Sequence, residues 1–134
     1  MTQNEELKTV IDIKDLVLKS LDENKAEDVL HIDLQGKSTI ADFMIVASGT
    51  SSRHVVSLAQ KAMEEVSKNY QGRRQRAEGM TEGDWVLVDF QDVILHVFRP
   101  EVREFYSLEK MWSAASVGVE HKRMVSKNSA NDAE

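Results

Sequence analysis

The sequence contains few of the residue combinations that carry out catalysis. Its four histidines are His31, His54, His96 and His121, and none stands four residues from another or within a tight cluster of carboxylates. Because a metal site needs several such ligands close together, this spacing does not predict one. Cysteine is absent, which excludes a thiol nucleophile, a cysteine zinc site and a disulfide framework.

The segment Gly49–Ser52 is the strongest candidate for anion binding. It stands between an apolar run and a helical pattern, where backbone N–H groups and the helix dipole can hold a phosphate. The Gly-Lys-Ser/Thr of a P-loop is missing, which favours a capped helix after a tight turn. A nucleotidyltransferase, with magnesium held by Asp89, is the alternative. Its metal site is incomplete, because Asp89 and Asp92 flank an expected turn. Serines near His54 give only a weak signal for nucleophilic catalysis, without the Gly-x-Ser-x-Gly elbow.

Two other segments could contact a partner. Trp85, Leu87 and Asp89 alternate along a predicted strand and therefore share one face. A carboxylate among apolar side chains favours partial exposure, and tryptophan is a common interface anchor. Ordinary core packing of Trp85 is the other interpretation. The basic run Arg73, Arg74 and Arg76 could touch a phosphate backbone or an acidic partner, or could be a solvated loop.

These residues must be positioned by an alternation of helices and strands. Apolar periodicity and turn residues predict helices over Val10–Asn24, Ser51–Asn69 and Glu101–Trp112, and strands over Val29–Leu34, Phe43–Ala47, Arg76–Glu78, Trp85–Phe90 and Val93–Phe98. Gln91-Asp92 is expected to form a two-residue hairpin loop. The order α-β-β-α-β-β-β-α predicts a single α/β domain with a mixed β-sheet and flanking helices.

The 134-residue length suits one domain, which we place at residues 10–112. Residues 1–9 are expected to form a polar, frayed segment, and residues 113–134 a polar, disordered tail. The net charge of −6 disfavours free nucleic acid as the main partner and suits a basic protein. No apolar run is long enough to span a membrane and no signal peptide is evident, so we expect a cytoplasmic protein without a membrane partner.

Six sequence blocks recur in an order that resembles the ribosomal silencing factor family, also called the Iojap family, over about residues 11–112. The blocks are Gly36-Lys37-Ser38, Ala41-Asp42-Phe43, Ala47–His54, Trp85–Asp89, His96–Glu101, and Arg103–Tyr106 with Leu108–Trp112. The resemblance implies a nucleotidyltransferase-like fold that lacks the catalytic carboxylates. It therefore implies a protein that is not an enzyme and needs no cofactor or metal.

The resemblance also implies a function and a site. Family members bind the large ribosomal subunit through ribosomal protein fourteen, and thereby block joining with the small subunit and repress translation under nutrient limitation. The implied partner-binding residues are Trp85, Leu87, Asp89, Asp92, Arg99, Pro100, Glu101 and Tyr106. Arg99 stands where many relatives carry histidine, and Ser107 where many carry aspartate. A secondary ribosomal RNA contact at Arg73, Arg74 and Arg76 and a homodimer of the free chain are further hypotheses.

Overall fold

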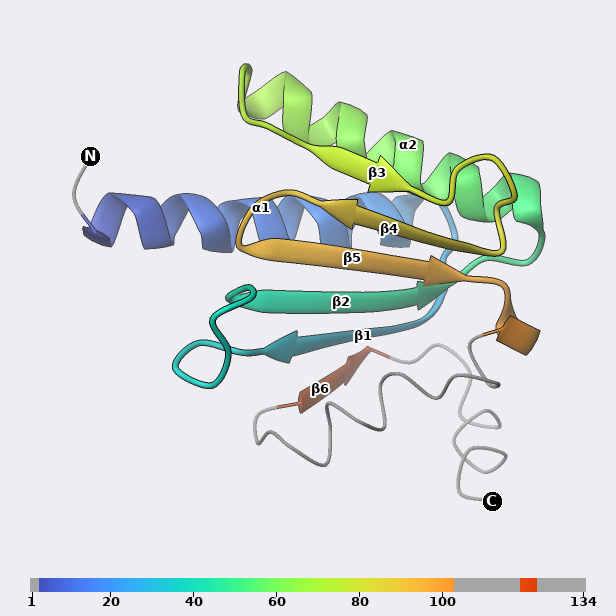
Figure 1. Cartoon of the computed structure of the whole chain (residues 1–134), viewed down its shortest axis with the longest axis horizontal. Coiled ribbons are helices and arrows are strands. Elements are labelled where there is room, and N and C mark those ends of the chain that lie inside the picture. The colour runs from blue at the N-terminus through green and yellow to red at the C-terminus, as the bar shows by residue number, and fades with distance from the viewer. Residues whose placement is uncertain (1–2, 103–118, 123–134) are drawn as a thin grey trace.

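The computed structural model describes residues 3–102 and 119–122. The elements are α1 (Gln3–Glu23), β1 (Glu27–Asp33), β2 (Phe43–Ser48), α2 (Ser52–Asn69), β3 (Arg76–Glu78), β4 (Trp85–Asp89), β5 (Val93–Phe98) and β6 (Val119–Lys122). The six strands form one sheet in the order β3-β4-β5-β2-β1-β6 (Figure 1). The β2–β5 pair is parallel and the other pairs are antiparallel, which confirms the predicted α/β domain with a mixed sheet.

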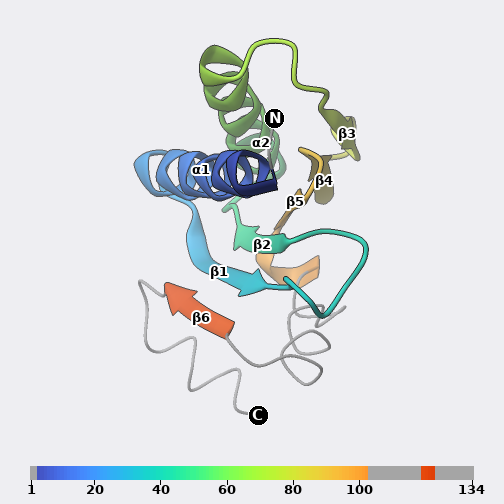
Figure 2. The same cartoon turned by 90° about the vertical axis from the view of Figure 1, so that its left-hand side faces the viewer.

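Both helices lie on the same face of the sheet (Figure 2). The inner stripe of α1 consists of Val10, Ile13, Val17 and Leu21, each at most 1% exposed. It packs with the inner residues of α2 against alternate residues of β2, β4 and β5. We expect burial of these side chains to be the main stabilising contribution to the fold, at roughly 2 kcal/mol for each large aliphatic residue.

The first helix is longer than the sequence prediction. It begins at Gln3, so the expectation of a frayed segment over residues 1–9 is wrong from residue 3 onward. The physical reason is local, because Glu, Leu and Lys are strong helix formers and Glu5 and Glu6 complement the helix dipole in the first turn. These first turns extend past the ends of the strands (Figure 1).

The second helix begins at Ser52, one residue after the predicted start, and ends at the predicted residue. Ser51 is its N-cap, and the serine hydroxyl accepts a hydrogen bond from the backbone N–H of His54 at 3.1 Å. The helix ends at Asn69, and Gly72 follows with a positive φ of 84°. The cap orients the backbone between Ser48 and Ser52, which links the central strand β2 to the helix.

The second face of the sheet is also apolar over β1 and β2. Leu30, Ile32, Leu34, Met44, Val46 and Phe98 form a second buried cluster, against which Trp85 and Val102 pack. Strand β2 is consequently buried on both faces, as its uninterrupted apolar run predicted. No helix within the described part of the chain is long and apolar enough to cross a membrane.

The hairpin of β4 and β5 has the predicted two-residue loop. Gln91 and Asp92 have φ values of 63° and 49°, and the N–H of Phe90 donates to the carbonyl of Val93 at 2.9 Å. Two left-handed residues in succession suit the right-handed twist of the paired strands. The Asp92 carbonyl also accepts from the N–H of Asp42 at 2.8 Å, which fixes the loop against the start of β2.

The C-terminal region differs from the sequence prediction. Strand β6 pairs with β1, from Val29 opposite Lys122 to Ile32 opposite Val119, so a wholly disordered tail over residues 113–134 is wrong for these residues. The outer edge of β1 supplies backbone partners that a local sequence pattern cannot reveal. Residues 100–102 are helical, and the rest of the helix predicted over Glu101–Trp112, including Tyr106 and Ser107, lies outside the described residues.

Candidate partner-binding site

The strand registers arrange the second face of the sheet in three rows. The rows are Trp85–Phe98–Ser48, Glu78–Leu87–His96–Val46–Leu30, and Arg76–Asp89–Ile94–Met44–Ile32. In each row the side chain nearest β3 is the most exposed. In the middle row, Leu30 and Val46 are at most 1% exposed and His96 is 6% exposed, while Leu87 is half-buried and the Glu78 side chain is 65% exposed.

We call the part of this second face carried by β3, β4 and β5 the outer sheet face. It combines half-buried Trp85 and Leu87 with charged side chains on either side. The alternation predicted along β4 is confirmed, because Val86 and Val88 point to the helix-covered core while Trp85, Leu87 and Asp89 lie on the opposite face. An apolar centre with a charged rim is the usual arrangement of a protein–protein contact surface.

At one end of the outer sheet face, Trp85 is held by an aromatic cluster. Its ring stacks on Phe98 with centroids 4.9 Å apart, and its indole N–H donates to Nδ1 of His96 at 3.0 Å. Burial lowers the pKa of His96 to about 4, so the imidazole is neutral at physiological pH and can accept this hydrogen bond. The indole ring of Trp85 is therefore held in a fixed position by Phe98 and His96.

The loop between β3 and β4 brings the backbone close to Trp85. Gly79 has a φ of 86°, and a Cβ atom at this position would lie 2.1 Å from the Trp85 carbonyl oxygen. Only glycine fits such an approach without moving the strand. Gly79 is thus part of what positions the tryptophan.

Arg99 lies at the same end and is held by two carboxylates. Its Nε donates to Asp84 Oδ1 at 2.9 Å, and its Nη1 donates to Glu101 Oε2 at 3.2 Å. Its backbone N–H also donates to the Asp84 carbonyl at 3.0 Å. Arg99 and Glu101 were both predicted as partner contacts, and the structure shows that they pair with each other. Pro100 follows on the surface and begins the helical residues 100–102.

Asp89 and Asp92 lie at the opposite end of the outer sheet face. Asp89 is four strand positions from Trp85, which is roughly 13 Å along β4. Its Oδ1 accepts from the N–H of Gln91 at 2.7 Å and so stabilises the hairpin loop. Both aspartates line a hollow of about 560 Å³ together with Ile40, which is 65% exposed. The predicted site residues therefore form two groups, one at each end of β4.

The basic run does not act as one patch. Arg74 and Arg76 line the same hollow as Asp89 and Asp92, so the predicted secondary contact adjoins the predicted main one. Arg73 instead turns inward, with a side chain only 13% exposed. Its Nε donates to the Phe90 carbonyl at 3.2 Å, and its Nη1 lies 3.8 Å from Glu6 Oε2, so this arginine ties α1 to the hairpin.

Acidic side chains at this end repel one another. The pKa of Asp42 is raised, first because burial penalises its charged form and then because Asp92 and Asp33 lie nearby. A carboxylate held against like charges gains from a cationic partner, since that partner relieves the repulsion. A basic group of a partner placed beside Asp92 would therefore relieve this repulsion, in a hollow that Arg74 and Arg76 also line.

The nucleotidyltransferase alternative loses its geometric basis. Gly49–Ser52 follow the end of β2 that aligns with Phe98 and Trp85, whereas Asp89 lies at the other end of β4. The suggested phosphate-binding segment and the suggested magnesium ligand therefore lie toward opposite ends of the sheet. Among the described residues, no three histidine, aspartate or glutamate side chains are grouped so that they could hold a metal ion.

His54 has a structural role beside this segment. Its Nδ1 accepts from the N–H of Thr50 at 2.9 Å, and its Nε2 lies 2.9 Å from the Asn24 carbonyl oxygen. Both ring nitrogens are thus engaged, and the side chain joins the start of α2 to the turn after α1. The suggestion of a serine–histidine nucleophile has no support in this arrangement.

Three residues of the site were missed by the sequence prediction. Ile40 stands between the Gly36-Lys37-Ser38 turn and the buried strand β2, and the sequence prediction did not single it out. The other two residues are Asp84, which accepts a hydrogen bond from Arg99, and His96, which accepts one from Trp85. Such pairings depend on which strands are neighbours, and no local pattern shows them.

The fold and the site together define an α/β domain with one helix-covered sheet face and a partly accessible, mixed-charge area on the other. A family model described as "Ribosomal silencing factor during starvation" matches residues 7–134. A ribosomal silencing factor RsfS of Zymomonas mobilis is 50% identical over 97 residues, which are 72% of this chain and 72% of that protein. The chain belongs to the ribosomal silencing factor family.

Two further relatives extend the comparison. The mouse protein named "Mitochondrial assembly of ribosomal large subunit protein 1" is 30% identical over 105 residues, covering 76% of this chain and 46% of that protein. A crystal structure of a Chromobacterium violaceum protein superposes with a TM-score of 0.73 at 33% identity, covering 78% of this chain and 86% of that chain. The family and its fold are thus shown by sequence and by structure.

Proposed function

We propose that the chain is a non-catalytic, cytoplasmic repressor of translation that binds the large ribosomal subunit. In this proposal its contact is ribosomal protein fourteen, and the bound chain sterically blocks joining with the small subunit when nutrients are scarce. Membership of the silencing factor family supports a ribosomal role. A mouse relative named for large-subunit assembly supports the choice of subunit.

The outer sheet face is the observation that carries the choice of contact surface. Leu87 supplies apolar area at its centre and Trp85 supplies it at one end, while Asp89 and Asp92 supply negative charge at the opposite end. A ribosomal protein is basic, because it lies against RNA phosphates, so opposite charges meet at that end. At the other end, Glu101 and Arg99 act as a pair whose outer atoms form the rim.

Co-sedimentation tests this function directly. The purified chain is mixed with isolated large subunits, small subunits are added, and the mixture is separated on a gradient. We expect the chain to travel with the large subunit and to lower the peak of joined particles. A chain that stays at the top of the gradient, with normal joining, would refute the proposal.

Two substitutions test the contact surface. Trp85→Ala is expected to weaken binding to ribosomal protein fourteen by ~2 kcal/mol or about 30-fold, since buried aromatic anchors dominate such interfaces. Leu87→Ser probes the same area without removing a ring that supports Phe98. Unchanged affinity of both variants, with folding verified by circular dichroism, would place the contact elsewhere.

A matched pair of aspartates tests the charged end. Asp92→Asn removes one charge at a position with a φ of 49°, and asparagine tolerates that conformation. Asp28→Asn removes a charge at a similar φ of 50° on β1, away from the hairpin. We expect Asp92→Asn to slow association about fivefold at low salt and Asp28→Asn to leave it unchanged. Equal effects would mean that only the net charge of the chain matters.

A further inference from the structure

The first half of α1 carries an apolar pair that the core does not use. Leu7 is 38% exposed and Ile11 is 37% exposed, while the core stripe of the same helix runs through Val10 and Ile13. Residues four apart lie on one side of a helix, so the two exposed side chains are neighbours. Both residues belong to the first half of α1, and the first turns of this helix extend past the strand ends (Figure 1).

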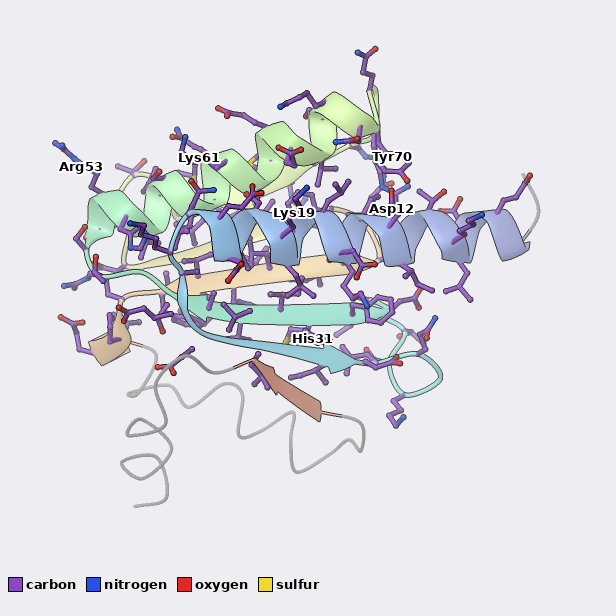
Figure 3. The ribbon with its side chains drawn as sticks, turned by 180° about the vertical axis from the view of Figure 1, so that it is seen from behind. Asp12, Lys19, His31, Arg53, Lys61 and Tyr70 are labelled. Carbon is purple, nitrogen blue, oxygen red and sulfur yellow. The ribbon has the colours of Figure 1, made fainter. Side chains whose placement is uncertain are left out.

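A hollow lies beside Ile11, the member of the pair that lines it. It has a volume of about 670 Å³ and is lined by Ile11, Asp12 and Tyr70 among others. Asp12 and Tyr70 lie side by side between α1 and the end of α2 (Figure 3). The Tyr70 hydroxyl donates a hydrogen bond to Asp12 Oδ2, and this bond raises the pKa of the phenol. The ring of Tyr70 is therefore fixed as an apolar wall with its polar atom already satisfied.

The walls of the hollow are predominantly negative. Glu5, Asp12 and Asp15 line it, with Lys8 as the single cation of the lining residues. Lys14, whose side chain is only 17% exposed, lies 3.3 Å from Asp15 and offsets part of that charge from the inner side. An apolar centre with an acidic rim fits a ligand that is apolar on one side and basic on its flanks.

We infer that this surface, here called the α1 groove, docks a basic amphipathic helix of a partner protein. A helix that presents apolar residues at i and i+4 can pack on Leu7 and Ile11, while its Lys or Arg residues meet the carboxylates of the rim. A second copy of the chain also carries a net charge of −6, so it does not supply the positive charge that complements this rim.

The α1 groove is separate from the outer sheet face. Helix α1 covers the opposite side of the sheet (Figure 2), so one partner can occupy the groove while another occupies the sheet. This inference does not depend on the proposed ribosomal contact. It adds a second binding surface to the chain, for a partner protein that presents a basic amphipathic helix.

The test uses a synthetic peptide of about 18 residues, built from leucine and lysine with leucines on one helical face, and its glutamate counterpart. Nuclear magnetic resonance titration of the full chain is expected to show shifts centred on Leu7, Ile11 and Tyr70 with the lysine peptide alone. Ile11→Ser is expected to weaken binding about tenfold. Ile40→Ser is the matched control, because Ile40 is an exposed isoleucine at the other surface.

Three outcomes would overturn the inference: no saturable binding of the lysine peptide, shifts centred on Trp85 instead, or equal affinity of the Ile11→Ser and Ile40→Ser chains. Light scattering over a dilution series supplies a further check. A dimer that Ile11→Ser abolishes would assign the groove to a second copy and also overturn the inference. Co-sedimentation of Ile11→Ser with large subunits stays normal if only the groove is affected, which separates this result from failure of the proposed function.

Discussion

At the scale of single residues, His96 couples the candidate site to pH. Its pKa falls from 6.5 to about 4 in the folded chain, because it is buried among Trp85, Phe98 and the strands. At a pH between these two pKa values, His96 binds a proton in more of the unfolded chains than of the folded chains. The free energy of unfolding is therefore expected to decrease as the pH is lowered from about 6.5 to about 4, by at most about 3 kcal/mol.

Denaturant unfolding at several pH values measures this effect. His96→Asn keeps a side chain that can accept from the indole N–H of Trp85 but does not titrate. We expect the variant to be less stable at neutral pH and to lose less stability on acidification. Parallel pH profiles for the two chains would show that other groups cause the acid sensitivity.

The effect of Asp42 on stability is expected to have the opposite dependence on pH. Its pKa is raised, chiefly by burial and then by Asp92 and Asp33, so its ionisation is less favourable in the folded chain than in the unfolded one. The stability that it contributes is present below pH 3.8 and is lost as the pH rises through the higher, folded value. Asp42→Asn is therefore expected to raise the melting temperature at pH 7 more than at pH 3, by differential scanning calorimetry. A larger gain at the lower pH would contradict this account.

The sequence predicts much at this scale where the information is local. Strand alternation places Trp85, Leu87 and Asp89 on one face, and the Ser51 cap follows from residue type and position. The ion pair between Arg99 and Asp84 could not be predicted in this way. Asp84 is 15 residues away and meets Arg99 only because β4 pairs with β5. Charge pairs between strands depend on register, and register is a property of the sheet.

At the scale of elements, the hairpin loop stores strain next to the charged end of the site. Gln91 and Asp92 both adopt left-handed conformations that Asn-Gly would adopt more easily. Replacing the pair with Asn-Gly is expected to raise the free energy of unfolding by about 1 kcal/mol, measured by urea unfolding. The same variant is expected to bind ribosomal protein fourteen more weakly, because Asp92 is lost. A gain in both properties would remove Asp92 from the proposed contact.

A substitution in the loop between β3 and β4 is expected to lower the free energy of unfolding instead. Gly79→Ala is expected to destabilise the chain by about 2 kcal/mol or more, because its Cβ would collide with the Trp85 carbonyl and its φ is 86°. The tryptophan fluorescence of the folded state should also change, since the start of β4 must shift. Gly72→Ala, with a φ of 84° and no atom within 4 Å of the added Cβ, is the control and is expected to cost less. Equal losses would mean that backbone strain, and not the collision, dominates.

Elements are predicted well when their periodicity is internal. The stripe of α1, the doubly buried β2 and the β4–β5 hairpin all follow from patterns of a few residues. Strand β6 could not be predicted in this way, because Val119–Lys122 gains its partners from β1, about 90 residues earlier. The early start of α1 was missed because the first turns bury little and so lack the core stripe.

At the scale of the whole molecule, the sheet separates two environments. The helices cover most of one face, and on the other face the side chains nearest β3 are the most exposed. This decrease places Trp85 and Leu87 at a boundary, neither inside the core nor fully in water. Half-buried apolar area of this kind is stabilised further when a second protein covers it.

Self-association through the outer sheet face is the last consequence of that arrangement. A two-fold pair that covers Trp85 and Leu87 could also place Arg76 of one copy near Asp89 of the other, because these residues are opposite each other on β3 and β4. We expect light scattering over a dilution series to show a dimer of the free chain that Leu87→Ser weakens. Addition of ribosomal protein fourteen should then dissociate the dimer, since both associations need the same apolar area. A dimer that persists in a ternary complex would show that the two surfaces are distinct, and a monomer at all concentrations would leave Trp85 and Leu87 accessible to the ribosomal protein alone.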